Sequence, residues 1–349
     1  MERSALRINR SDDQRVCSLA HLSDFHFVGE LTESGRRLWT KGVKSHSFAK
    51  IDALSQEFYE FRRLDSYPDV IVVTGDVSTD GSTQSLETAL GFIQGSEIFK
   101  GVPGRLITTG LCASPDRRII IPGNHDRYGF GLLPLQRTSD ALESVFSTSR
   151  EYPYVVVYHP TYDNHTPLLF FLFDSTLPKW VSAPPWNRVA QGWIQPAECR
   201  WLAEQPQKIR GGGRVQGLDG QPVEVNYDSA IRVAILHHHP VQVRHGDQVL
   251  TKLQNAEGFV DACFEARIHL VLFGHEHVRH DSELARHGHI VRFLCCPSTS
   301  EFSSEMNGFY LIHFSKSMAI EVEPYLWVEQ SSMFVKVERP PAKEKAAGL

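Results

Sequence analysis

Hydrophobic positions along the chain fall into short runs separated by polar loops, and this pattern predicts alternating strands and helices. The run Val70–Val73 is continuous and β-branched, which is typical of a strand buried on both faces. Apolar residues recur three or four positions apart over Phe48–Leu64, which predicts a helix. By the same reasoning we expect strands at Val16–Leu22, Ile119–Ile121, Tyr154–Tyr158, Leu168–Asp174, Ile231–Leu236, Leu270–Phe273 and within 290–337, and helices near Ser85–Gln94, Glu198–Leu202 and Phe259–Ala266. This alternation predicts an α/β fold.

The pattern also predicts a single folded unit with surface additions. Residues 16–337 show no linker and no internal repeat, so we expect one domain there. Loop-like or glycine-rich stretches predict surface insertions near 97–117 and 204–228, the second of which includes an expected hairpin over 211–220. Residues 1–15 are polar and 338–349 are rich in Pro, Lys and Ala, so we expect a flexible N-terminus and a disordered tail.

Composition excludes several classes of protein. Lys and Arg number 36 against 41 Asp and Glu, and the net charge of −5 disfavours a general nucleic-acid binder, although a local basic strip remains open. The longest apolar run, Leu168–Phe173, is far below the ~20 residues of a membrane-spanning helix. The start of the sequence shows no secretory pattern, and none of the six cysteines forms a C-x-x-C pair. We therefore expect a reduced, cytoplasmic protein without a membrane partner; its oligomeric state stays open.

Polar side chains recur where five of the predicted strands end. The chain has 17 histidines, and seven of them fall in four short motifs at such ends. The five groups are Asp24 with His26, Asp76, Asn124 with His125 and Asp126, His237, and His275 with His277. Ligand sites in α/β sheets form at the carboxyl ends of parallel strands. We therefore expect these side chains to meet at one edge.

The chemistry of these side chains fits a pair of divalent cations. Imidazole and carboxylate ligands suit Mn, Fe, Zn or Co, and the ligands do not distinguish among these metals. In a D-x-H motif both side chains point to the same side, and the two oxygens of Asp76 allow it to bridge two ions. Taken singly, each motif has an ordinary alternative, such as a turn at Gly75-Asp76 or a solvated loop at 237–239. Their ordered combination favours the metal site.

The ordered motifs, from Ser23-Asp24-Phe25-His26 to Gly274-His275-Glu276-His277, resemble the calcineurin-like metallophosphoesterase superfamily over about residues 16–300. The resemblance implies a four-layer αββα sandwich in which two mixed β-sheets are flanked by helices. It implies one metal ion held by Asp24, His26, Asp76 and His277, and a second held by Asp76, Asn124, His237 and His275. It also implies that His125 is catalytic and that Asp126 orients it. In the run 237–239, His237 matches the ligand position and His238 is the alternative.

A finer resemblance points to bacterial cyclic-nucleotide phosphodiesterases. The segments that carry it are Gly42–Phe48, Phe173–Thr176, Gly192–Gln195 with Trp201-Leu202, His237–Pro240 and Pro297–Thr299, whereas 97–117 and 204–228 depart from that subgroup. It implies a small phosphoester substrate, either a cyclic nucleotide or a nucleotide-like diester. A hydroxide held between the two ions would attack phosphorus while His125 assists the leaving group. The alternatives are a phosphomonoesterase or protein phosphatase with the same site, and a non-catalytic scaffold of the same fold.

Overall fold

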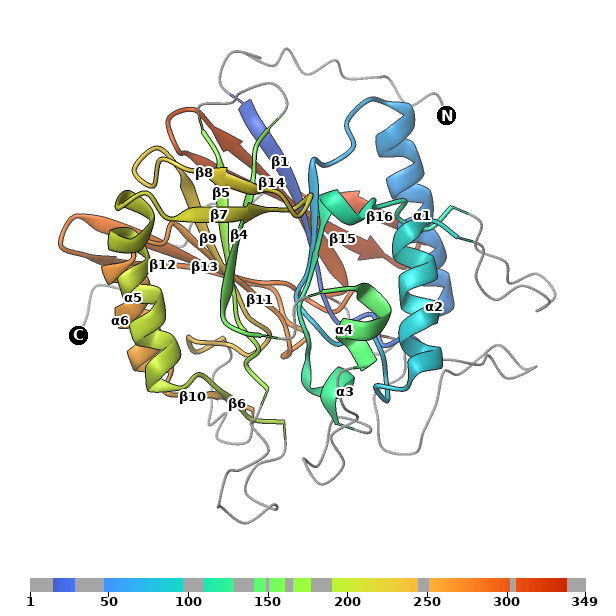
Figure 1. Ribbon diagram of the computed structural model, residues 1–349. Helices are drawn as coiled ribbons and strands as arrows, with labels where there is room; N and C mark the ends of the chain where they lie inside the picture. Colours follow the sequence, from blue (N-terminus) through green and yellow to red (C-terminus); the bar gives the residue numbers. More distant parts are fainter. Residues whose placement is uncertain are drawn as a thin grey trace, which may run out of the picture.

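The computed structural model describes residues 15–28, 47–96, 109–128, 141–148, 151–160, 166–176, 190–243, 251–301 and 306–337 (Figure 1). The expected tail at 338–349 lies outside these ranges, as do nearly all of the expected flexible N-terminus and the part of the expected insertion at 97–108. Within the described ranges, the structure contains no helix long and apolar enough to cross a membrane.

Two large mixed sheets form the centre of the fold. The first has the order β16-β15-β14-β1-β2-β3 and contains β1 (Arg15–Leu22), β2 (Val70–Val73), β3 (Arg118–Ile120), β14 (Gly308–Ser315), β15 (Ile320–Val328) and β16 (Met333–Lys336). The second has the order β12-β13-β11-β9-β5-β4-β7-β8 and contains β4 (Tyr154–Tyr158), β5 (Leu168–Leu172), β7 (Arg214–Gly217), β8 (Pro222–Glu224), β9 (Ile231–Ile235), β11 (Leu270–Phe273), β12 (His280–Arg286) and β13 (His289–Cys295). A separate parallel pair joins β6 (Gly192–Trp193) to β10 (Leu253–Gln254).

Helices cover the outer face of each sheet, so the fold has four layers (Figure 1). The first sheet is covered by α1 (Phe48–Arg63) and α2 (Thr83–Gln94), with the short α4 (Ala141–Phe146) beside α2. The second is covered by α5 (Pro196–Arg210) and α6 (Ala256–Glu265). Two short helical turns, η1 (Pro115–Arg117) and α3 (Asn124–Arg127), flank β3. The predicted αββα sandwich is confirmed.

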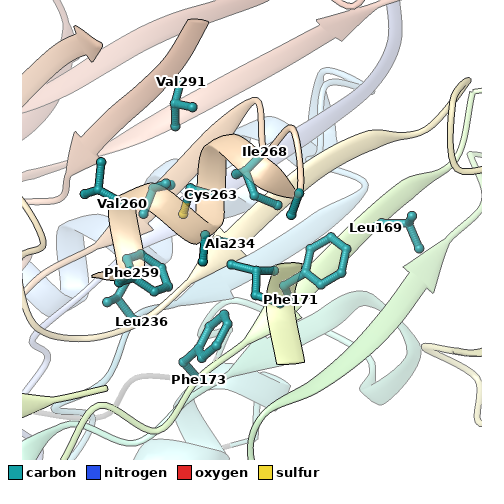
Figure 2. Close-up of a cluster of buried hydrophobic side chains, with 14 of the residues drawn as sticks. Leu169, Phe171, Phe173, Ala234, Leu236, Phe259, Val260, Cys263, Ile268 and Val291 are labelled. Atoms are coloured by element: carbon teal, nitrogen blue, oxygen red, sulfur yellow. The ribbon is translucent and has the colours of Figure 1, made fainter. Parts of the chain in front are cut away.

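The strand pattern explains the layering. In β2, Ile71 and Val73 face the helices and join the core that contains Phe58, whereas Val70 and Val72 face the second sheet. Both faces of the strand are therefore buried, and this is why its run is apolar without interruption. A third core lies between the second sheet and its helices, where the rings of Phe173 and Phe259 pack 5.3 Å apart (Figure 2).

Two expectations for the middle of the chain are corrected. The helix expected at Glu198–Leu202 extends over Pro196–Arg210, with Pro206 inside it. Proline in a helix interior removes a backbone hydrogen bond, so the sequence suggested an earlier end; burial of Leu202 and Ile209 in the same core supports the longer helix. The stretch 204–228 is more than a surface insertion. The expected hairpin is present as β7–β8, and β7 extends the second sheet by pairing in parallel with β4.

The ligand-bearing strands belong to both sheets rather than to one edge of a single sheet. β1, β2 and β3 are parallel neighbours in the first sheet, and β9 and β11 are parallel neighbours in the second. The backbone N–H of His275, after β11, donates to Asp24 Oδ2, after β1, at 3.2 Å. Burial of the apolar faces between the sheets brings the ends of the two sets of strands together.

Candidate metal centre

Sharp backbone turns direct the candidate ligands inward. Five of the seven predicted metal ligands have a positive φ, from 50° to 76°: Asp24, His26, Asp76, His275 and His277. L-residues seldom adopt this left-handed region, although Asp and His tolerate it better than most, and such residues cluster at functional sites. Each chain segment thus turns immediately after its strand. The side chains then point into one shared space.

One set of candidate ligands consists of Asp24, His26 and His277. His277 Nε2 lies 3.2 Å from Asp24 Oδ1, and His26 Nε2 lies 3.9 Å from the same oxygen. The side chains of all three are buried, and their ligand atoms all lie within 4.8 Å of one another. This spacing allows one cation to contact all three.

A second set surrounds His237. Its Nε2 lies 3.0 Å from Asn124 Oδ1, 3.2 Å from His275 Nδ1 and 3.3 Å from Asp76 Oδ2. The same Asp76 oxygen lies 3.8 Å from His26 Nε2 in the first set. Asp76 therefore stands between the two sets, in the position that a bridging carboxylate needs. The structure brings together all seven ligands predicted from the sequence.

The protonation of the histidines fits cation binding. His237 Nδ1 lies 2.6 Å from the Thr74 carbonyl oxygen and His277 Nδ1 lies 2.8 Å from Glu301 Oε2. Both oxygens only accept, so each Nδ1 carries a proton, and Nε2 of each ring is the atom that a second proton or a cation can occupy. These Nε2 atoms face oxygens of Asp76, Asn124 and Asp24. A cation in this space would be attracted by both the nitrogens and the oxygens.

The electrostatics of the centre favour positive charge. Burial lowers the pKa of His237, but Asp76, Asp24 and the Thr74 carbonyl together outweigh burial and raise it to about 9. Burial likewise lowers the pKa of His277, but Asp24 and Glu301 together raise it to about 10. Burial and the neighbouring histidines hold the pKa of His275 well below its usual value, so this ring is neutral and available as a ligand. The centre therefore attracts a proton, or a cation in its place.

His237 and its neighbour His238 differ in their contacts. Ser175 Oγ accepts the backbone N–H of His237 at 3.2 Å and of His238 at 3.1 Å, and it lies 2.9 Å from Nδ1 of His238. His237 Nε2 faces Asn124 Oδ1 at 3.0 Å and Asp76 Oδ2 at 3.3 Å. The ligand atoms of His237, His238 and His275 also lie within 4.8 Å of one another. The contacts with Asn124 and Asp76 favour His237 as the ligand.

His125 lies beside the two sets and is partly exposed, whereas Asp76 and His26 next to it are buried. Its backbone N–H donates to Asp76 Oδ1 at 2.8 Å, and its ring lies 4.5 Å from the ring of His26. Its Nδ1 lies 2.9 Å from the carbonyl oxygen of Thr79, which fixes the ring and leaves Nε2 as its other nitrogen.

We expected Asp126 to orient the His125 ring, but the group that lies against Nδ1 of this ring is the carbonyl of Thr79. Asp126 is buried and accepts bonds from the backbone N–H of Gly123 at 3.0 Å and from the backbone N–H and hydroxyl of Ser78 at 2.9 Å and 2.8 Å. The short helix α3 turns Asp126 beneath the loop after β2. Asp126 therefore connects the two loops that carry Asp76 and His125, and Thr79 holds the His125 ring.

Sequence reasoning missed the groups that hold the candidate ligands and His125 from outside. Two of them, Thr74 and Thr79, act through backbone carbonyls, which have no sequence signature. The third is Glu301, a buried residue 24 positions after His277. Its only sequence signal is a carboxylate directly after the Pro297–Ser300 segment.

Gly123 allows the loops after β2 and β3 to approach closely. A Cβ at this position would lie 2.1 Å from Asp76 Oδ1 and 2.4 Å from the backbone N of Asp76. Because the second of these atoms is backbone, we expect Gly123→Ala to displace the Asp76 loop and to destabilise the fold by about 1–3 kcal/mol, as other overpacked sites do. Urea unfolding with metal analysis of the purified variant measures both effects. Wild-type stability together with wild-type metal content would contradict the close packing described here.

Comparison with known proteins agrees with this geometry. The chain belongs to the calcineurin-like phosphoesterase family, whose sequence profile matches residues 18–279. Members of this family use a dinuclear centre of divalent metal ions. The chain is accordingly a metal-dependent phosphoesterase.

Solved structures with a similar fold are distant in sequence. They include a dimetal phosphatase from Danio rerio (TM-score 0.49, 13% identity, 86% of this chain and 93% of that one). A second is the sulfate thiohydrolase SoxB from Thermus thermophilus (TM-score 0.43, 11% identity, 92% of this chain and 58% of that one). A third is a single mutant of Vps29 from Entamoeba histolytica (TM-score 0.35, 12% identity, 93% of this chain and 99% of that one). Comparison with curated proteins gives no match. These similarities identify no substrate, so the family assignment depends on the profile.

Proposed function

We propose that the protein is a phosphodiesterase that hydrolyses a cyclic nucleotide or a nucleotide-like diester, with two divalent cations as cofactors. The observation that carries this proposal is the pair of ligand sets that share Asp76, with the partly exposed His125 beside them. One cation would be held by Asp24, His26, Asp76 and His277. The other would be held by Asp76, Asn124, His237 and His275. Mn, Fe, Zn and Co all suit these ligands.

The preference for a diester is supported by contacts among the segments that resemble bacterial cyclic-nucleotide phosphodiesterases. Ser175 contacts His238, and the backbone N–H of Trp193 donates to the Ser175 carbonyl at 2.8 Å. Ser298, from the last of these segments, donates its hydroxyl to the Asp24 carbonyl at 2.9 Å. Segments far apart in the chain thus surround one centre. Their similarity to that subgroup therefore concerns the site itself.

The residues of the chain divide the chemical work as follows. Bound divalent cations lower the pKa of a water and neutralise charge on phosphoryl oxygens. His125, with its Nδ1 held by Thr79, presents Nε2 as the atom that carries a proton to the leaving oxygen. The Asp76 carboxylate accepts the backbone N–H of His125 at 2.8 Å, which holds this residue beside the two ligand sets.

The remaining proposals concern partners and location. A small phosphoester is the expected partner, and the net charge of −5 does not favour nucleic acid. None of the six cysteines forms a disulfide bond, and five of them are buried, which supports a reducing compartment such as the cytoplasm.

Paired model substrates test the proposed reaction. We expect the Mn²⁺-loaded protein to hydrolyse bis-p-nitrophenyl phosphate faster than p-nitrophenyl phosphate, because the second oxygen substituent of the diester lowers the charge that the site must accommodate. Chelation should abolish this activity, and added Mn²⁺ should restore it. A preference for the monoester would instead indicate a phosphomonoesterase or protein phosphatase. A lack of turnover with any of the four metals would indicate a scaffold.

A further inference from the structure

Glu301 supports the first ligand set from outside. Its side chain is 4% exposed, and Oε2 lies 2.8 Å from Nδ1 of His277. The opposite atom of that ring, Nε2, faces Asp24 Oδ1 at 3.2 Å. Glu301 therefore contacts a candidate ligand on the side away from the proposed cation, and it is not itself a ligand.

The backbone around Glu301 is fixed by several bonds, so its carboxylate has a defined position. Its backbone N–H donates to Ser298 Oγ at 3.1 Å, and its carbonyl accepts from the buried ammonium of Lys50 at 2.8 Å. Ser298 Oγ donates in turn to the carbonyl of Asp24 at 2.9 Å. One short segment thus supports two members of the first set, Asp24 through the backbone and His277 through a carboxylate.

The second ligand set is supported differently. His237 Nδ1 donates to the carbonyl oxygen of Thr74 at 2.6 Å, and that group is neutral. A carboxylate that accepts the N–H of a ligating imidazole raises the basicity of the other ring nitrogen, and it adds a negative charge near the cation. A neutral carbonyl fixes the ring but adds no charge. The first set already holds the carboxylate of Asp24 where the second holds the neutral amide of Asn124, and Glu301 adds a further negative charge beside the first set only.

We propose that Glu301 is a positioning residue that strengthens cation binding selectively at the Asp24, His26 and His277 set, so that the two sites of the centre have unequal affinities. It acts through His277, by holding the proton on Nδ1 and directing the Nε2 lone pair toward Asp24. The inference rests on the metal ligands assigned under the proposed function.

Calorimetric titration of Mn²⁺ into chelator-treated protein tests the proposal. We expect the wild type to bind two ions with different constants. Glu301→Gln keeps the size of the side chain and an acceptor oxygen but removes the charge, and we expect it to weaken the tighter constant by about 10–100-fold and to leave the weaker one unchanged. Glu323→Gln is the matched control, because Glu323 Oε2 lies 3.4 Å from Nε2 of His313 in the same first sheet, away from the centre. It should change neither constant.

Thermal unfolding of the metal-free variants separates a positioning role from a merely structural one. We expect Glu301→Gln to unfold within a few degrees of the wild type. If the variant refolds only with metal, competition against a chelator of known affinity yields the same two constants. Unchanged constants in Glu301→Gln would overturn the proposal, and so would an equal loss at both sites accompanied by a lower unfolding temperature. A wild type that binds no pair of ions would instead refute the ligand assignment.

Discussion

Asp76→Ala is expected to yield a protein that retains neither cation and has no detectable phosphoesterase activity. Asp76 Oδ2 lies 3.3 Å from Nε2 of His237 and 3.8 Å from Nε2 of His26, so one carboxylate serves both ligand sets. Burial raises its pKa, but His237 and His125 outweigh burial and hold the pKa well below its usual value, so the group is ionised. Removing it takes a negative charge and a ligand from each site. Elemental analysis after gel filtration should show a fall from two ions per chain to none.

The control for Asp76 lies in the same loop. Asp80 accepts the backbone N–H of Ser82 at 3.0 Å beside the start of α2 and belongs to neither ligand set. Asp80→Ala should therefore keep both ions and most of the activity. If Asp76→Ala retained one tightly bound ion and measurable turnover, Asp76 would not be shared between the sites.

His125→Ala is expected to lower kcat by about 10²–10⁴-fold while both cations stay bound. The ring is partly exposed, is held by Thr79 at Nδ1 and lies beside the shared Asp76, but it belongs to neither proposed ligand set. Its removal therefore deletes a proton donor and leaves the metal ligands in place. Steady-state kinetics with a diester substrate, together with metal analysis of the same sample, measure the two effects separately.

His287 provides the matched control for His125. It is an exposed residue in the turn between β12 and β13, and His287→Ala should leave both kcat and metal content unchanged. Full activity in His125→Ala would refute the proton-donor role. Loss of metal from His125→Ala would indicate that this ring is a ligand rather than a proton donor.

The strands and the candidate ligands were predictable because each has a local signature, whereas the four layers were implied by the family resemblance. A strand buried on both faces needs an uninterrupted apolar run, and Val70–Val73 shows one a single residue before Gly75-Asp76. Asp and His placed at the ends of such runs have no packing role, so their chemistry stands out. For this reason the sequence predicted seven candidate ligands, and the structure brings these side chains together.

Other features could not be predicted because they depend on contacts between distant segments. The sequence does not show that β9 and β11 lie in a different sheet from β1, β2 and β3, since both sheets use the same strand pattern. The contacts that separate His237 from His238 depend on Asn124 and Asp76, which lie more than 100 positions earlier in the chain. The carbonyl of Thr79, which holds His125, is a group that every residue has. The family resemblance implied that role for Asp126 instead.

If distant side chains form one centre for two cations, both ions can be located in a crystal. Anomalous X-ray diffraction at the manganese edge, from crystals grown with Mn²⁺, measures their positions directly. We expect two anomalous peaks on either side of the Asp76 carboxylate, one contacting Asp24, His26 and His277 and the other contacting Asn124, His237 and His275. A single peak, or peaks bound only to residues outside this set, would contradict the account.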